Sequence, residues 1–112
     1  APGMKYKHYA PHTKVIVVKG ESRDFARYVN SKGDKIGALC FDEDLPYIKV
    51  PAVPYGHAGR PDTQARGLFD ALRHLDGLNV DVVYARYPDM DGMGLAVYNR
   101  LMRAAAFEVV EL

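Results

Sequence analysis

The chain has 112 residues, which is enough for one hydrophobic core and one domain. Its 15 Lys and Arg residues nearly balance its 14 Asp and Glu residues, and the net charge of +1 excludes a general electrostatic attraction to nucleic acid or to an anionic membrane. The single cysteine excludes an internal disulfide framework, and the sequence carries neither a signal peptide nor a long apolar span, so we expect a cytoplasmic domain.

A basic and aromatic run precedes the first predicted strand. Prolines before and after it leave too few residues for a helix. Lysine and imidazole groups donate hydrogen bonds to anions, and tyrosine rings add flat apolar area, so this composition suits the grip of a phosphate- or carboxylate-bearing ligand. A frayed terminus is the alternative that composition alone favours. The members of the run that carry this chemistry are Lys5, Tyr6, Lys7, His8 and Tyr9.

The first half of the folded part alternates apolar runs with a helical pattern. Residues 14–18 are a β-branched run ended by Gly20, which predicts a centrally placed strand buried on both faces. Cap chemistry at 21–24, followed by apolar residues at helical spacing, predicts a helix that ends near Gly33. Residues 35–41 return to strand character.

The second half repeats this alternation. Two prolines near Val53 limit the β-like stretch around it to a short strand. The patterns that follow predict a helix between Pro61 and Gly77, a strand at 80–87, a helix at 95–105 and a last strand at 107–112. Gly67 costs the first of these helices roughly 1 kcal/mol relative to alanine, so packing must hold that turn.

Strands that alternate with helices in one short chain indicate a mostly parallel sheet with right-handed crossovers. We therefore predict an α/β fold: a small Rossmann-like three-layer sandwich, with a mostly parallel sheet of about five strands and helices on both faces.

A glycine pair opens the last predicted helix. Gly92 and Gly94 follow a strand, as the glycines of a phosphate-binding turn do. The third glycine of the dinucleotide fingerprint is replaced by Val97, so a tight strand-to-helix connection is the alternative. Arg100, on the same helix, could bind an anion or form a surface ion pair. Gly92, Gly94 and Arg100 therefore belong to a second hypothesis: an independent nucleotide- or phosphate-binding module, receiver-like or flavodoxin-like.

The remaining candidates favour structural roles. Asp42, Glu43 and Asp44 follow a strand and could hold Mg²⁺, but a solvated acidic turn before a proline is the favoured interpretation. Cys40 lies in an apolar strand without a base beside it in sequence, so we expect an inert buried thiol. The four histidines show no metal-ligand spacing, so we expect no metal site.

Two motifs resemble a known family. The run at 2–11 resembles the Pro-Gly-Met-Lys-Tyr-Arg-His-Tyr-Ala-Pro linker of the long, two-domain form of L-threonylcarbamoyladenylate synthase, and residues 92–105 resemble a second segment of that family. Further matches at 53–56 and 65–75 extend the resemblance over essentially the whole chain. Ala1 stands where the family commonly has Ser, and Lys7 where it commonly has Arg. The second departure matters more, because an ammonium group cannot reproduce the planar, bidentate grip of a guanidinium.

The resemblance implies an interdomain linker at 1–13 and a Rossmann-like accessory, regulatory domain at 14–112. The linker residues Lys5 to Tyr9 would form a lid over the active site of a YrdC-like catalytic domain, the expected partner in the same parent chain. That parent would need ATP and Mg²⁺ to make threonylcarbamoyl-adenylate and pyrophosphate from threonine and bicarbonate, for the threonylcarbamoyl modification of adenosine in tRNA. For this domain the resemblance implies no catalytic residue, no cofactor of its own and no direct contact with tRNA.

Overall fold

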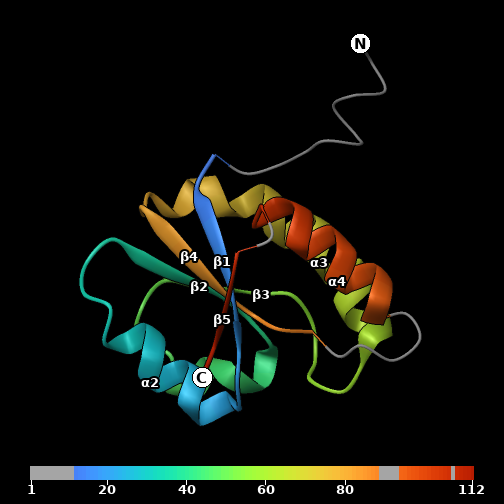
Figure 1. The fold of residues 1–112 in the computed structure, drawn as a ribbon, viewed down its shortest axis with the longest axis horizontal. Coiled ribbons are helices and arrows are strands. Elements are labelled where there is room, and N and C mark those ends of the chain that lie inside the picture. Colours follow the sequence, from blue (N-terminus) through green and yellow to red (C-terminus); the bar gives the residue numbers. More distant parts are fainter. Residues whose placement is uncertain (1–11, 89–93, 107) are drawn as a thin grey trace.

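The computed structural model describes residues 12–88, 94–106 and 108–112 (Figure 1). These residues form five strands, three α-helices and two short 3-10 helices. In chain order they are β1 (Lys14–Lys19), α2 (Ser22–Asn30), β2 (Ile36–Cys40), η1 (Asp42–Tyr47), β3 (Ala52–Pro54), α3 (Pro61–His74), η2 (Leu75–Leu78), β4 (Val82–Arg86), α4 (Gly94–Ala104) and β5 (Val109–Glu111). None of the helices in these ranges is long and apolar enough to cross a lipid bilayer.

The five strands form one parallel sheet in the order β3-β2-β4-β1-β5. Helix α2 covers one face of this sheet, and α3 and α4 lie side by side on the other face (Figure 1). The predicted three-layer α/β sandwich is therefore confirmed. The central placement of the first strand is wrong by one position, because β4 lies in the middle and β1 lies between β4 and β5. Equally apolar strands carry no signal of their order in space.

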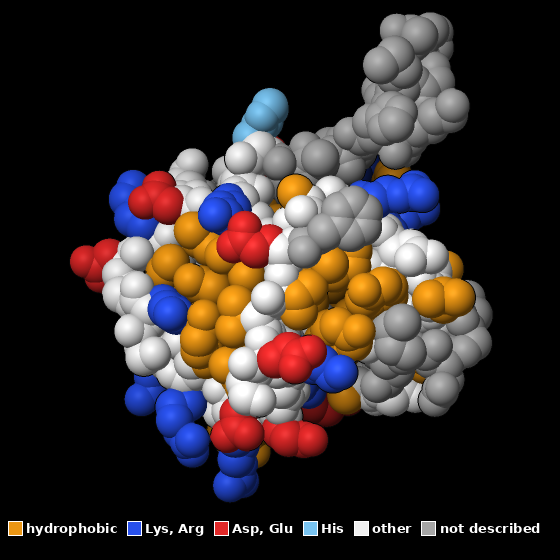
Figure 2. All heavy atoms as spheres, in the orientation of Figure 1, with side chains coloured by type: hydrophobic (Ala, Val, Ile, Leu, Met, Phe, Trp, Pro, Cys, Tyr) orange, Lys and Arg blue, Asp and Glu red, His pale blue; other side chains and the backbone are white. Residues whose placement is uncertain are grey.

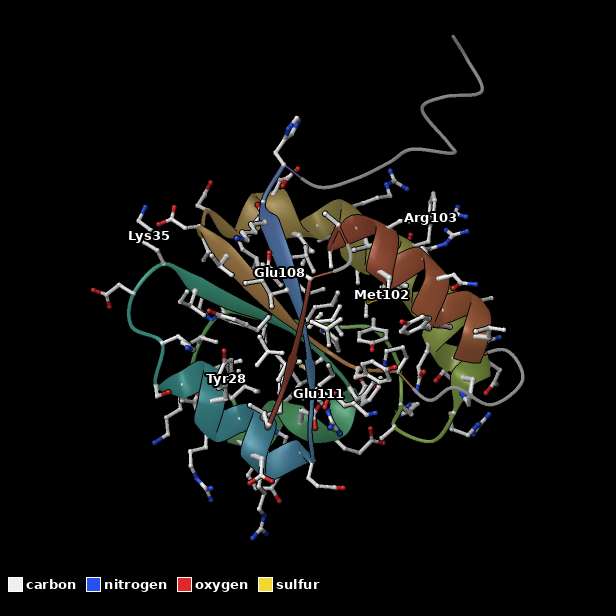
Figure 3. The ribbon with its side chains drawn as sticks, in the orientation of Figure 1. Tyr28, Lys35, Met102, Arg103, Glu108 and Glu111 are labelled. Atoms are coloured by element: carbon white, nitrogen blue, oxygen red, sulfur yellow. The ribbon has the colours of Figure 1, made fainter. Side chains whose placement is uncertain are left out.

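Two hydrophobic clusters hold the layers together, one on each face of the sheet. The residues of β1 alternate between them: Val15 and Val17 face α3 and α4, whereas Ile16 and Val18 face α2. All four are buried, so the prediction of a strand covered on both faces is confirmed. On α4, Met102 points toward the sheet and its neighbour Arg103 points away from it (Figure 3).

The sheet is less well covered where it ends at β5. This strand has only three residues and pairs with the second half of β1, from Val17 to Lys19. Hydrophobic side chains gather on both sides of β5 at the surface (Figure 2). Val109 is 37 % exposed and Leu112 is 51 % exposed, so this edge keeps apolar area in contact with water.

Gly67 lies where α3 approaches the backbone most closely. A Cβ atom at this position would lie 2.9 Å from the carbonyl carbon and oxygen of Tyr55, which follows β3 and is fully buried. The helix therefore packs directly on main-chain atoms, and only glycine leaves room for this contact. Packing compensates for the weak helix propensity of Gly67, as the sequence required.

The ends of two helices differ from those predicted. Helix α2 ends at Asn30 rather than near Gly33, because the N–H of Ser31 bonds to the carbonyl of Tyr28. Helix α3 does not end at Gly77 but continues as η2 to Leu78, and Asn79 takes the left-handed conformation with φ of 56°. Asparagine tolerates this conformation better than most residues, so it can close a helix where a glycine is expected.

Candidate functional site

An open hollow of about 500 Å³ lies at the carboxyl ends of β1 and β4. These neighbouring strands lead to helices on opposite faces of the sheet, since α2 follows β1 and α4 follows β4. Ligands of open α/β sheets bind at such switch points. Lys19, Arg86 and Tyr87 line the hollow together with the acidic residues Glu21, Asp24 and Glu111. The lining therefore mixes both signs of charge.

A buried ion pair lies next to the hollow. The carboxylate of Asp44 is fully buried and accepts hydrogen bonds from Nε of Arg86 at 2.9 Å, from the N–H of Phe41 at 2.9 Å and from the hydroxyl of Ser22 at 2.5 Å. Arg86 also donates to the carbonyl oxygen of Gly20. These bonds join β4, η1 and the start of α2, so the ion pair stabilises the packing of these elements at the carboxyl edge of the sheet.

The predicted solvated acidic turn is wrong at Asp44. The turn is a 3-10 helix, and Asp44 lies inside the protein because Arg86 and the first turn of α2 supply donors for it. Among the residues that the structure describes, no three His, Cys, Asp or Glu side chains come together as metal ligands.

Asp42 and Glu43 face the loop after β3 instead. Nδ1 of His57 lies 3.3 Å from Oδ2 of Asp42 and 3.1 Å from Oε2 of Glu43. The N–H of Ala58 donates to Oε1 of Glu43 at 2.9 Å. This backbone donor, followed by the N–H of Glu43 itself and then by His57, lowers the pKa of Glu43 below its ordinary value. The two carboxylates therefore hold the loop at 57–58 against η1.

Cys40 has the inert environment expected for it. Its side chain is fully buried at the end of β2. Burial, reinforced by the nearby charges of Asp44 and Asp42, raises its pKa to about 12. The thiolate that a nucleophile requires is therefore disfavoured near neutral pH. The predicted burial of the thiol is confirmed.

Two of the candidate nucleotide residues, Gly94 and Arg100, lie on α4 away from the hollow. Gly94 is buried at the start of α4, and Arg100 lies farther along α4 with its guanidinium 5.6 Å from the centre of the Phe69 ring. Neither is among the residues that line the hollow. Gly92 and the linker residues Lys5, Tyr6, Lys7, His8 and Tyr9 lie outside the described residues. Anion contact through Gly92, Gly94 and Arg100 therefore stays a prediction.

Sequence reasoning missed a carboxylate that holds the start of β1. Oδ1 of Asp76, in η2, accepts the N–H and the hydroxyl of Thr13, both at 2.9 Å, and Oδ2 accepts the N–H of His12 at 3.1 Å. Burial alone would raise the pKa of Asp76, but these donors hold it below its ordinary value. The partners are 63 and 64 residues apart, so no local sequence pattern could have revealed them.

The chain is similar to proteins of one family. The family model for the C-terminal domain of threonylcarbamoyl-AMP synthase matches residues 1–106. The threonylcarbamoyl-AMP synthase of Pyrococcus abyssi is 36 % identical over 122 residues, covering 100 % of this chain and 34 % of the relative. That of Bacillus subtilis is 36 % identical over 115 residues, covering 98 % of this chain and 33 % of the relative. The chain thus spans about a third of the length of the curated relatives it matches.

Solved structures agree with this match in fold and in extent. The crystal structure of P. abyssi Sua5 complexed with L-threonine superposes with a TM-score of 0.71 at 35 % identity, covering 100 % of this chain and 34 % of that chain. The crystal structure of a C-terminal Sua5 domain from Pyrococcus horikoshii superposes with a TM-score of 0.58 at 28 % identity, covering 92 % of this chain and 100 % of that one. A domain of this extent has therefore been crystallised by itself. Sequence and fold together show that the chain belongs to the family of threonylcarbamoyl-AMP synthase C-terminal domains.

Proposed function

We propose that this chain is the accessory, regulatory domain of a longer enzyme that makes threonylcarbamoyl-AMP for the modification of tRNA. The observation that carries the proposal is the family match over nearly the whole chain, together with relatives about three times as long. In this proposal a YrdC-like catalytic domain of the same parent binds ATP, Mg²⁺, threonine and bicarbonate. Residues 1–13 are the linker to it, and residues 14–112 are the body.

The chemistry of the body supports an accessory role rather than a catalytic one. Within the described ranges, the thiol and the serine and threonine hydroxyls are already committed. Cys40 is a buried thiol with a pKa of about 12, and each hydroxyl donates a hydrogen bond inside the body: those of Ser22, Thr13, Ser31 and Thr63. His57 is held between Asp42 and Glu43 on an exposed loop. A catalyst that works through a covalent intermediate needs a nucleophile, a base that activates it and an oxyanion site within reach of one another. These groups do not provide that arrangement.

The proposed role of the linker is that of a lid on the catalytic domain. Lys5, Lys7 and His8 supply positive charge for the phosphates of ATP and pyrophosphate, and Tyr6 and Tyr9 supply rings that exclude water. Closing such a segment orders the reactants, and product release requires it to open. The body serves as the anchor from which the lid moves.

Alanine substitutions in the linker of the full-length parent test this role. We expect Tyr6→Ala, His8→Ala and Tyr9→Ala together to lower the turnover of threonylcarbamoyl-AMP by roughly 100-fold, because misplaced reactants lose that much rate. The melting temperature should stay within about 2 °C, since the lid is not part of the core. Turnover is measured as pyrophosphate release, and stability by thermal unfolding.

The matched control is Tyr47→Ala, which removes a tyrosine ring that is 44 % exposed on the body. It should leave turnover within about twofold of the parent. Turnover and stability falling together in the triple variant would show that the linker serves packing, and the lid role would then be abandoned.

A further inference from the structure

Asp76 has a rigid support. It lies in η2, directly after α3, and its neighbour Leu75 is fully buried in the cluster beneath α3 and α4. Leu78, at the other end of η2, packs against the same cluster. Both flanks of Asp76 are thus anchored in the core, so its carboxylate has a defined position relative to the sheet.

The carboxylate binds two successive residues just ahead of β1. One oxygen takes the N–H and the hydroxyl of Thr13, and the other takes the N–H of His12. Hydrogen bonds from ionised acceptors are stronger than neutral ones. Because both N–H groups are held by one carboxylate, the backbone at His12 and Thr13 has a defined orientation. The chain therefore acquires its direction two residues before the sheet begins.

We propose that Asp76 is a positioning residue, which sets the direction in which the linker leaves the body toward the catalytic domain. This inference rests on the proposed lid function. Without these hydrogen bonds the linker would be held only from Lys14 onward and would sample many more directions. Each closure of the lid would then have to order it again. With residues 12 and 13 held by Asp76, part of the entropy cost of closure is already met in the open state.

Two substitutions of Asp76 differ in how many of these hydrogen bonds they remove. Asp76→Ala removes all three hydrogen bonds. Asp76→Asn can keep an oxygen acceptor for Thr13, but its amide nitrogen cannot accept the N–H of His12. The wild-type protein, Asp76→Asn and Asp76→Ala should therefore form a graded series. Asp70→Asn is the matched control, because it removes a carboxylate from the exposed surface of α3.

The first experiment measures hydrogen exchange of backbone amides in this 112-residue chain. In Asp76→Ala we expect exchange at His12 and Thr13 to accelerate at least about tenfold, while the amide of Val17 inside the sheet keeps its protection. Asp76→Asn should accelerate His12 more than Thr13. The control should change neither amide. Unchanged exchange at both residues in Asp76→Ala would show that the carboxylate does not hold them, and the inference would fail.

The second experiment measures turnover and KM in the full-length parent, well below its melting temperature. We expect kcat to fall about tenfold in Asp76→Ala and less in Asp76→Asn, with KM for ATP nearly unchanged, because the variants affect lid closure rather than ground-state binding. A merely structural role would lower the melting temperature in this order and leave kcat unchanged. Faster exchange with unchanged kcat would therefore overturn the inference. The triple alanine variant of Tyr6, His8 and Tyr9 distinguishes the failure of the lid role from the failure of the positioning role of Asp76. Normal turnover in that variant would refute the lid role itself.

Discussion

At the scale of single residues, the strongest constraint is the ion pair between Asp44 and Arg86. The side chain of Arg86 is 12 % exposed and that of Asp44 is fully buried. If either side chain were removed, the charge of the other would be buried where water solvates it poorly. The guanidinium also lies 5.1 Å from the centre of the Phe41 ring, which adds a cation–π contact to the pair.

We expect Asp44→Ala to lower the free energy of unfolding by about 3–5 kcal/mol, because it leaves Arg86 buried without a counter-charge and Ser22 without an acceptor. Urea denaturation of the 112-residue chain measures this loss. The matched control is Asp24→Ala, which breaks an exposed pair with Arg27 and should cost less than about 0.5 kcal/mol. Similar losses in both variants would mean that the pair is effectively solvated.

The sequence indicated that Arg86 needs a partner, but it did not indicate that the partner is Asp44. Arg86 ends an apolar strand at the carboxyl edge of the sheet, and a charge in such a place needs a partner. Asp44 could not be chosen over Asp42 or Glu43, because all three precede Pro46 and only the path of η1 decides which one turns inward. The linker candidates are a different case, because the role proposed for them depends on a neighbouring domain.

At the scale of secondary structure elements, the contact between α3 and the backbone at Tyr55 decides how closely that helix approaches the sheet. Gly67→Ala places a methyl group 2.9 Å from two main-chain atoms, which cannot move as a flexible side chain could. We expect a net loss of about 1–3 kcal/mol in the free energy of unfolding, although alanine is the better helix former.

Gly77→Ala is the control for this substitution, because nothing lies within 4 Å of the added Cβ. It should be neutral or stabilise the protein by up to about 1 kcal/mol. Both variants are compared by urea denaturation of the same chain. A stabilised Gly67→Ala variant would show that α3 moves outward at little cost.

Apolar patterns were sufficient to predict the five strands and the three α-helices. The helices repeat apolar residues at helical spacing, whereas the strands buried on both faces, β1 and β2, are continuous apolar runs. These patterns failed at the ends of elements and at the 3-10 helices. The acidic segment after β2 has no periodic signal of its own, and it winds into η1 because Asp44 binds the N–H of Phe41 and Arg86. Such segments are shaped by tertiary contacts, which no local window contains.

At the scale of the whole molecule, sequence alternation predicted a parallel sandwich but not the order of its strands. The order β3-β2-β4-β1-β5 depends on which strand each crossover passes, and the loops alone do not specify this. The two clusters, one on each face, give the body a core of its own. A homologous domain of this extent was crystallised by itself, in agreement with such independence.

We therefore expect the purified 112-residue chain to be folded but unable to make threonylcarbamoyl-AMP. Incubation with ATP, Mg²⁺, threonine and bicarbonate should release no pyrophosphate above the rate without protein, while the full-length parent serves as the positive control. Circular dichroism with cooperative thermal unfolding checks that the chain is folded in the same samples. Pyrophosphate release that depends on threonine and bicarbonate would show that the body itself is a catalyst.

The pairing of β1 with β4 and β5 has a consequence for biosynthesis. Residues 14–19 are synthesised before both of their partners in the sheet, which lie at 82–86 and 109–111. At about 5–20 residues per second, the nascent chain waits roughly 3–13 s before β4 can pair with β1. During that interval the run Val15-Ile16-Val17-Val18 has no sheet to join, so its apolar side chains stay exposed until β4 is made.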